Sequence, residues 1–237
     1  MNTGTAQVVI LAGGLGTRLR PVTTQVPKPM VPVAGVPYLE HQLRLLAEQG
    51  FSDVVLLTGY LGEQIEQYFG TGSRLGLNLR YSREPAPLGT GGALREARPL
   101  LAEEFLVIYG DSYLPIRYAS VMERLRSSGA EGVLVLYHDP AGETDVPGNV
   151  AIDAQGVVTR YDKSGTNDPA LRYVEAGVLA LRKSVLDLVP ATGVVSLEQE
   201  IFPRLIVRRA LVGLPTPQRF YDIGTPERLR AIEALLG

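Results

Sequence analysis

The sequence predicts an α/β protein with a Rossmann-like core of three layers, in which helices cover both faces of a mostly parallel sheet. Short β-branched runs alternate with amphipathic segments through the first half of the chain. A glycine-rich loop follows the first of these runs directly. Hydrophobic residues make up 45% of the 237 positions, which is enough for one large core.

The apolar patterns divide the chain into a regular series of elements. We expect strands where β-branched and aromatic residues are concentrated, at residues 8–12, 54–58, 77–82, 105–109, 132–137, 149–153, 157–162 and 173–181. We expect helices where apolar residues recur every three to four positions, at residues 37–49, 62–69, 91–101, 117–128, 184–189, 197–209 and 226–236. Pro37 suits the first turn of its helix, and Gly50 suits the C-terminal cap.

The strands after residue 139 follow one another with little helix between them. We therefore read residues 139–180 as a small mixed α/β insertion into the parallel core. The sequence contains no hexapeptide repeat, so no β-helix is expected at the C-terminus.

Composition and charge exclude several classes of protein. The formal net charge of −2 offers no electrostatic basis for binding nucleic acid or an anionic membrane. The absence of cysteine excludes disulfides, zinc–thiolate sites and a thiol nucleophile. No stretch approaches the ~20 apolar residues of a membrane span. The N-terminus lacks the apolar run of a signal peptide, so a cytoplasmic protein is expected.

The loop after the first strand has the character of a phosphate site. Its glycines allow backbone N–H groups to approach an anion closely. The dinucleotide-binding fingerprint is excluded because Leu19 stands where its third glycine belongs, and the Gly-Lys-Ser/Thr of a P-loop is missing. Arg18 and Lys28 add two cations, which suit a polyphosphate.

This loop, together with Pro27-Lys28-Pro29, resembles the signature of the sugar-1-phosphate nucleotidylyltransferases, the NDP-sugar pyrophosphorylases. The resemblance continues through residues 32–37, 87–93, 110–111 and 222–226, and so spans nearly the entire chain. It implies one nucleotidyltransferase domain over residues 1–237, with a nucleotide-binding half at 1–138 and a sugar-binding half with closing helices at 139–237. The implied reaction joins a sugar 1-phosphate to a nucleoside triphosphate (NTP) and releases pyrophosphate.

The resemblance also implies roles for individual residues. The implied catalytic residues are Arg18, Lys28 and Asp111. Arg18 would hold the pyrophosphate leaving group, and Lys28 would bridge the α-phosphate of the NTP and the sugar phosphate. Asp111 and Asp222 each lie at a strand end and are the implied ligands of the cofactor Mg²⁺. The implied nucleotide-binding residues are Leu11, Ala12, Gly13, Gly14, Gly16, Thr17, Arg18, Glu84, Gly89 and Thr90. The implied sugar-phosphate-binding residues are Lys28, Asp162, Lys163, Glu175 and Gly177.

The substrates are less closely defined than the reaction. The loop at residues 84–90 looks most like that of guanylyltransferases acting on mannose- or heptose-type 1-phosphates, so GTP is the expected NTP. Glu84 could accept both N–H donors of the guanine edge. Glu175 stands where several relatives carry asparagine, and Asp162 stands where glutamate is commoner. A uridylyl-, cytidylyl- or thymidylyltransferase, a non-catalytic NDP-sugar sensor and a homodimer all stay open.

Overall fold

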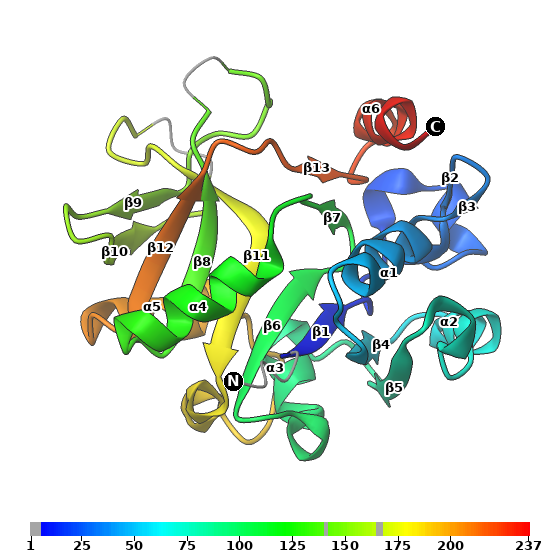
Figure 1. Ribbon diagram of the computed structural model, residues 1–237, viewed down its shortest axis with the longest axis horizontal. Coiled ribbons are helices and arrows are strands. Elements are labelled where there is room, and N and C mark those ends of the chain that lie inside the picture. The colour runs from blue at the N-terminus through cyan, green and yellow to red at the C-terminus, as the bar shows by residue number, and fades with distance from the viewer. Residues whose placement is uncertain (1–5, 140–141, 165–167) are drawn as a thin grey trace.

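A seven-stranded sheet runs through the computed structural model, which describes residues 6–139, 142–164 and 168–237 (Figure 1). Its order is β12-β8-β11-β6-β1-β4-β5. The strands are β1 (Gln7–Leu11), β4 (Asp53–Thr58), β5 (Asn78–Arg83), β6 (Glu104–Tyr109), β8 (Gly132–Tyr137), β11 (Val174–Arg182) and β12 (Leu211–Thr216). β11 runs antiparallel to both its neighbours, and the other pairs are parallel. The predicted mostly parallel sheet is confirmed.

Helices cover both faces of this sheet, which confirms the predicted three layers (Figure 1). The α-helices are α1 (Tyr38–Glu48), α2 (Gly62–Phe69), α3 (Gly89–Glu96), α4 (Tyr118–Ser128), α5 (Phe202–Val207) and α6 (Pro226–Leu236). On one face, α1, α2 and α4 pack through Leu43, Ile65 and Leu125. On the other face, α3 and α5 pack through Leu94 and Leu205. Because both faces are covered, the inner strands β1, β4, β6, β8 and β11 are mostly apolar runs, whereas the edge strand β5 alternates polar and apolar residues.

Three two-stranded sheets lie beside the central sheet in the described part of the chain. They pair β2 (Pro32–Val33) with β3 (Val36–Pro37), β7 (Ser112–Tyr113) with β13 (Tyr221–Asp222), and β9 (Val150–Ile152) with β10 (Val158–Tyr161). The pairing of β7 with β13 brings the C-terminal segment next to the end of β6. Asp222 of β13 is thereby placed next to Ser112, the residue after Asp111.

The position of β11 corrects part of the predicted insertion. The sequence pattern places residues 173–181 in the insertion, but this run forms β11 between β6 and β8 in the central sheet. Its residues from Val174 to Leu181 are all buried, as a strand covered on both faces requires. The order of elements along the chain does not reveal which strands become neighbours in space. Of the three strands expected in the insertion, only β9 and β10 lie outside the central sheet.

Four further differences concern single elements. β12 was not predicted because Gly213 and Pro215 break its apolar run, yet at the edge of a sheet such a strand accepts proline. The predicted helix at 91–101 ends at Glu96 and continues as a 3-10 helix, Arg98–Leu100, that contains Pro99. The predicted helix at 197–209 starts as a π-helical turn, Leu197–Ile201, before α5, and the one at 184–189 is the 3-10 helix Lys183–Leu188.

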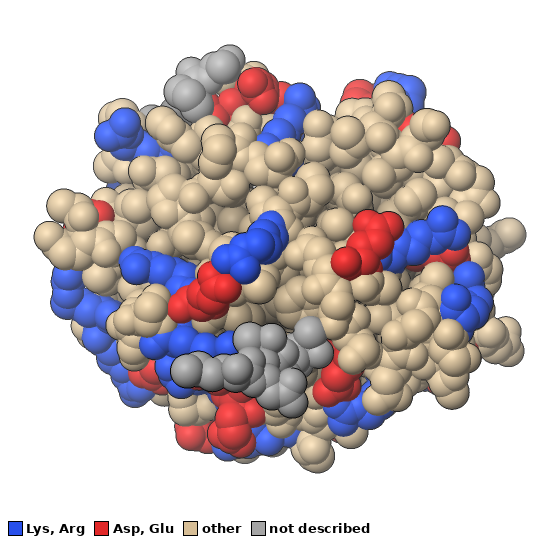
Figure 2. Space-filling model, viewed as in Figure 1, with Lys and Arg blue, Asp and Glu red and all other residues tan. Residues whose placement is uncertain are grey.

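The surface carries charges of both signs. Figure 2 shows acidic and basic side chains close to one another across the displayed face. Ion pairs such as Arg117–Glu123 at 2.5 Å and Arg126–Glu104 at 2.8 Å are examples of this mixing. No helix within the described ranges is both long enough and apolar enough to cross a membrane.

Candidate active site

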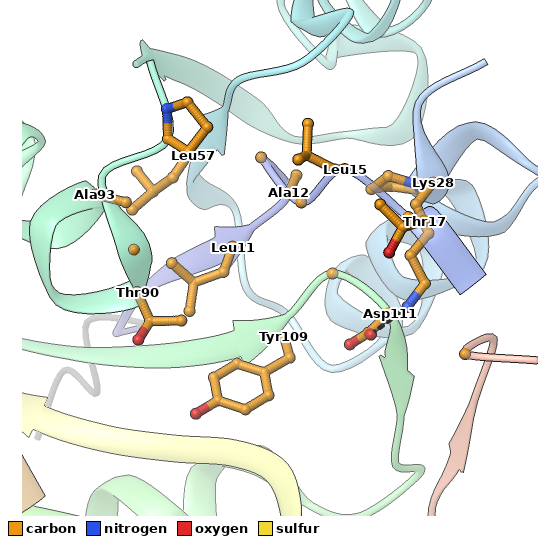
Figure 3. Close-up of a pocket in the computed structure, with 18 of the residues that line it drawn as sticks. Leu11, Ala12, Leu15, Thr17, Lys28, Leu57, Thr90, Ala93, Tyr109 and Asp111 are labelled. Carbon is orange, nitrogen blue, oxygen red and sulfur yellow. Dashed lines mark hydrogen bonds and ion pairs between the residues drawn. The ribbon is translucent and has the colours of Figure 1, made fainter. Parts of the chain in front are cut away.

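A cavity of about 440 Å³ opens where β1, β4 and β6 end, at the carboxyl edge of the sheet (Figure 3). Open α/β sheets bind their ligands at this edge. Lys28 and Asp111 lie at one end of the cavity, and Thr90 and Tyr109 lie toward the other (Figure 3). The predicted site residues that line it are Leu11, Ala12, Gly13, Gly14, Gly16, Thr17, Arg18, Lys28, Glu84, Gly89, Thr90, Asp111 and Lys163.

The glycine-rich loop folds back over the segment that carries Lys28. Gly16 has a φ of 61°, in the left-handed region that glycine adopts without strain. A Cβ at Gly16 would lie only 3.0 Å from Cβ of Lys28, so this close approach also requires glycine. The hydroxyl of Thr23 donates to the Gly16 carbonyl at 2.8 Å and holds the fold of the loop.

Lys28 and Asp111 form an ion pair inside the cavity. The Lys28 ammonium lies 2.5 Å from Oδ2 of Asp111, and the lysine is only 9% exposed. Lys28 begins a short 3-10 helix between two prolines, and Asp111 directly follows β6 and Gly110. The chain thus joins a buried cation and a carboxylate that lie 83 residues apart in sequence.

The two predicted metal ligands lie on neighbouring segments. Asp222 of β13 pairs with Ser112 of β7, and the amide of Ile223 donates to the Asp111 carbonyl at 3.1 Å. The Asp222 carboxylate, however, lies outside the cavity lining. It accepts from the Gly224 amide at 2.6 Å and from Arg228 at 2.9 Å.

Arg18 reaches the same corner from the glycine-rich loop. A Cβ at Gly224 would lie 3.3 Å from a terminal nitrogen of Arg18 and 2.7 Å from an Asp222 oxygen. Both groups therefore lie beside Gly224. No cluster of three or more His, Cys, Asp or Glu side chains suited to a metal occurs among the described residues.

The loop at residues 84–90 brings Glu84 against the glycine-rich loop. One Glu84 oxygen accepts the Leu88 amide at 3.0 Å. The other lies where a Cβ at Gly13 would come within 2.6 Å, so glycine at this position makes room for the carboxylate. Burial raises the pKa of Glu84, and the hydrogen bond from Leu88 opposes that effect.

At the far end of the cavity, Glu198 collects four donors. The hydroxyls of Thr90 and Ser196 donate to Oε2 at 2.7 Å each, and the Tyr109 hydroxyl donates to Oε1 at 2.6 Å. The Lys163 ammonium lies 3.4 Å from Oε1. The Thr90 hydroxyl also accepts the Leu197 amide at 2.8 Å, so its proton and one of its two acceptor positions are used within the protein.

The remaining predicted sugar-site residues lie behind Lys163 or to its side. Glu175 is 7% exposed and accepts the Gly177 amide at 2.8 Å, while its Oε2 lies 3.9 Å from the Lys163 ammonium. Asp162 pairs instead with Arg160 at 3.1 Å and accepts from Ser164. Asp162, Glu175 and Gly177 are not among the residues that line the cavity.

Comparison with known proteins identifies the family. The sequence profile described as nucleotidyl transferase matches residues 7–236. The chain belongs to this family. It is 35% identical to the mannose-1-phosphate guanylyltransferase of Mycobacterium tuberculosis over 96% of this chain and 63% of that protein. It is 33% identical to the D-glycero-alpha-D-manno-heptose 1-phosphate guanylyltransferase of Aneurinibacillus thermoaerophilus over 94% of this chain and 95% of that protein.

Solved structures agree with this family assignment. The crystal structure of HddC from Yersinia pseudotuberculosis complexed with GMP-PN has a TM-score of 0.83 and 27% identity, and the match covers 98% of this chain and 100% of that one. The resemblance to a nucleotidylyltransferase and the α/β fold are thereby confirmed. The chain spans less than two thirds of the Mycobacterium relative and nearly all of the Aneurinibacillus one.

Two residues of α1 in this nucleotidyl transferase, Gln42 and Tyr38, were not predicted from the sequence to belong to the site. The Gln42 amide donates to the carbonyls of Tyr109 at 3.0 Å and Ser112 at 2.6 Å, so it holds the turn that carries Asp111. One helical turn earlier, the fully buried Tyr38 hydroxyl makes no hydrogen bond within the described chain. Burial raises the pKa of Tyr38, with a further contribution from the nearby charges of Asp111 and Asp222.

A signal for these residues exists in the sequence. Gln42 is a polar side chain on the apolar face that α1 forms with Leu39, Leu43 and Leu46. Glu198 likewise stands within the buried start of a helix, between Leu197 and Ile201. A buried polar residue on an otherwise apolar face must find a partner, which marks it for closer attention.

Proposed function

We propose that this chain is a sugar-1-phosphate nucleotidylyltransferase that uses GTP and a mannose- or heptose-type 1-phosphate. In the reaction, an oxygen of the sugar phosphate attacks the α-phosphorus of the NTP. The bond from that phosphorus to the β-phosphate oxygen breaks, and pyrophosphate leaves with the bonding electrons. The products are an NDP-sugar and pyrophosphate.

The observation that carries this proposal is the convergence of Lys28, Asp111 and the glycine-rich loop in one cavity that Lys163 also lines. A backbone with exposed N–H groups suits the triphosphate, and two buried or half-buried lysines suit the two phosphates that must meet. Phosphoryl transfer of this kind needs positioned charge more than a covalent protein intermediate. A cavity with cations at separate points supplies such positioning.

Each cation has a place in this scheme. Lys28 lies between the α-phosphate and the sugar phosphate, and Arg18 neutralises charge on the departing pyrophosphate. Lys163 orients the incoming sugar phosphate from the opposite end of the cavity. The backbone of residues 11–16 holds the nucleotide, and Glu84 meets the base from the adjoining loop.

Asp111 and Asp222 fit a divalent cation such as Mg²⁺. Their segments are hydrogen-bonded to one another, and two carboxylates together with phosphate oxygens suit the preference of Mg²⁺ for oxygen ligands. Bound there, the ion would offset negative charge on the triphosphate. Asp222 would have to share its carboxylate between the ion and Arg228.

The choice of GTP and of the sugar rests on the relatives. The Mycobacterium and Aneurinibacillus proteins are guanylyltransferases by name, for mannose and heptose 1-phosphates respectively. Glu84 supports guanine because a carboxylate can accept from adjacent N–H groups of its edge. We infer a cytoplasmic enzyme, where both substrates would be available.

A substrate grid tests the proposal. Pyrophosphate release is measured with Mg²⁺ for GTP, UTP, CTP, dTTP and ATP, each against mannose, glucose, N-acetylglucosamine and heptose 1-phosphates. We expect product with GTP and a mannose- or heptose-type substrate, and none from Asp111→Asn prepared identically. Product only with another NTP would reassign the base. If no substrate pair releases pyrophosphate but the protein still binds an NDP-sugar, a non-catalytic NDP-sugar sensor would be favoured.

A further inference from the structure

Lys163 lies in a cage of acidic and aromatic side chains. Its ammonium is 3.4 Å from Glu198 and 3.9 Å from Glu175. It also lies 5.4 Å from the ring centre of Tyr109 and 5.9 Å from that of Tyr161. The lysine side chain is nevertheless 44% exposed, and it lines the cavity.

Lysine is scarce in this chain, and the site takes most of it. Of 23 basic residues only three are lysines, at positions 28, 163 and 183. Lys28 and Lys163 line the cavity, while Lys183 donates to the Leu101 carbonyl at 2.7 Å elsewhere. The other basic residues of the chain are arginines, so lysine at position 163 is not one of many interchangeable surface lysines.

Glu198 has no remaining acceptor capacity for a sugar hydroxyl. Each of its oxygens has two acceptor positions, and each already faces two donors. Three of the four donors come from distant parts of the chain: Thr90 at the start of α3, Tyr109 at the end of β6, and Lys163 after β10. The fourth, Ser196, lies two residues before Glu198. The carboxylate therefore organises its protein neighbours, and a direct contact with the sugar is not its task.

A carboxylate at this position is not explained by packing. Glu198 is 8% exposed, and removing a charge from water is costly unless partners compensate. Burial alone would raise the pKa of Glu198, but the charge of Lys163 and the hydroxyls of Tyr109, Thr90 and Ser196 lower it to about 2. The Glu198 carboxyl group is thus ionised. The cost of removing its charge from water is offset by the hydroxyls and the ammonium that contact it.

We propose that Glu198 is a positioning residue that fixes the Lys163 ammonium at the sugar-phosphate end of the cavity. This inference rests on the proposed function, in which Lys163 binds the incoming sugar phosphate. Long lysine side chains lose much rotamer freedom when they bind an anion. A lysine that is already held loses less, so preorganisation by Glu198 strengthens phosphate binding.

Kinetics of Glu198→Gln test this inference. We expect the KM for the sugar 1-phosphate to rise about tenfold while the KM for the NTP stays within about twofold, the scale of one charge-assisted hydrogen bond. Glu200→Gln is the matched control, since Glu200 lies on the same helical turn but accepts only the Ser196 amide in this network, at 2.9 Å. In a Lys163→Met background, Glu198→Gln should cause little further loss. Equal increases in both KM values, or full additivity with Lys163→Met, would overturn the role.

Lysine-selective NMR of the free protein gives a readout that is independent of turnover. With ¹³C-lysine, the chain gives three side-chain signals at the ε-carbon, and Lys28→Met and Lys163→Met assign two of them. Glu198→Gln should move the Lys163 signal, and Glu200→Gln should not. An unmoved signal would refute the contact. If Glu198→Gln does not fold, Glu198→Asp withdraws the charge by one methylene and serves the same measurement.

The two arms separate this inference from the proposed function. A wild-type protein that yields no product across the substrate grid would refute the proposed reaction. The NMR signal would still decide whether Glu198 holds Lys163. Conversely, normal turnover with an unmoved Lys163 signal would leave the reaction in place and reject the role of Glu198.

Discussion

Arg18 and Arg20 are exposed arginines of one loop, but of the two only Arg18 lines the cavity. We expect Arg18→Ala to lower turnover by about 100-fold, the scale on which a preorganised charge contact stabilises a transition state. Arg20→Ala should leave turnover close to that of the wild type. Pyrophosphate release with the productive substrate pair measures both. Equal effects of the two variants would contradict the role of Arg18 on the leaving group.

Glu175 gives stability a dependence on pH whose sign is defined. Burial raises its pKa from 4.5 to about 7; Lys163 and the Gly177 amide oppose this shift, while Glu198 and Asp111 add to it. Tyr161 also faces the carboxyl group, at 3.5 Å. The folded protein keeps a proton that the unfolded chain releases, so this contribution is complete below pH 4.5 and is lost as the pH rises through about 7.

Replacing Glu175 isolates this effect from other titrating groups. Between pH 5 and 8, the free energy of unfolding of the wild type from urea titrations should fall relative to that of Glu175→Gln by an amount on the order of 3 kcal/mol in total. Glu200→Gln, which removes a carboxylate outside the cage, should run parallel to the wild type. Parallel curves for wild type and Glu175→Gln would refute the raised pKa.

At the scale of elements, the bulge in β11 decides how closely this strand passes the turn that carries Asp111. The register of β11 against β8 shifts between Glu175 and Leu179, and Gly177 within this stretch has a φ of 76°. A side chain at Gly177 would collide with Ser112, the residue after Asp111. The glycine thus lets β11 pass close to the Asp111 turn.

Two glycines with similar backbone angles separate strain from collision. Gly193 has a φ of 89°, and a Cβ there would meet nothing within 4 Å. Gly193→Ala should cost the backbone strain alone, about 1 kcal/mol. Gly177→Ala should lower the free energy of unfolding by a further ~1–3 kcal/mol because the added methyl overpacks against Ser112. Urea unfolding of both variants measures the difference, and equal losses would contradict the close approach.

At the scale of the whole molecule, α6 packs beside the segment that carries Asp222. Ile232 packs into a small buried cluster with Val33, Tyr38 and Ile223. In the first turn of α6, Arg228 binds Asp222. The C-terminal helix therefore connects the core under α1 to the second predicted metal ligand.

Truncating Ile232 tests how strongly this helix is held. Ile232→Ala should lower the free energy of unfolding by about 2–3 kcal/mol, because it leaves a cavity in a fully buried cluster. Replacing Leu235, which is 46% exposed on the same helix, with alanine should lower the free energy of unfolding by no more than about 0.5 kcal/mol. Comparable losses for the two variants in urea unfolding would show that α6 is not anchored through Ile232.

The sequence by itself determined the layered architecture and identified the glycine-rich loop, Lys28 and Asp111, which line one cavity. Alternating apolar runs predicted the three layers, because strand and helix periods are local properties of the chain. The glycine-rich loop, Lys28 and Asp111 could also be found, since their spacing in a long signature is visible without a fold. The family comparison confirmed the resemblance, and the roles of individual residues stay predictions.

Tertiary structure alone decided the far end of the cavity. The position of β11 between β6 and β8 could not be read from chain order, and it brings Glu175 and Gly177 beside the Asp111 turn. Glu198 meets Thr90 across 108 positions, and Gln42 meets Ser112 across 70. Local patterns fix which side chains are buried, but the partner that satisfies a buried polar group is chosen by packing between distant segments.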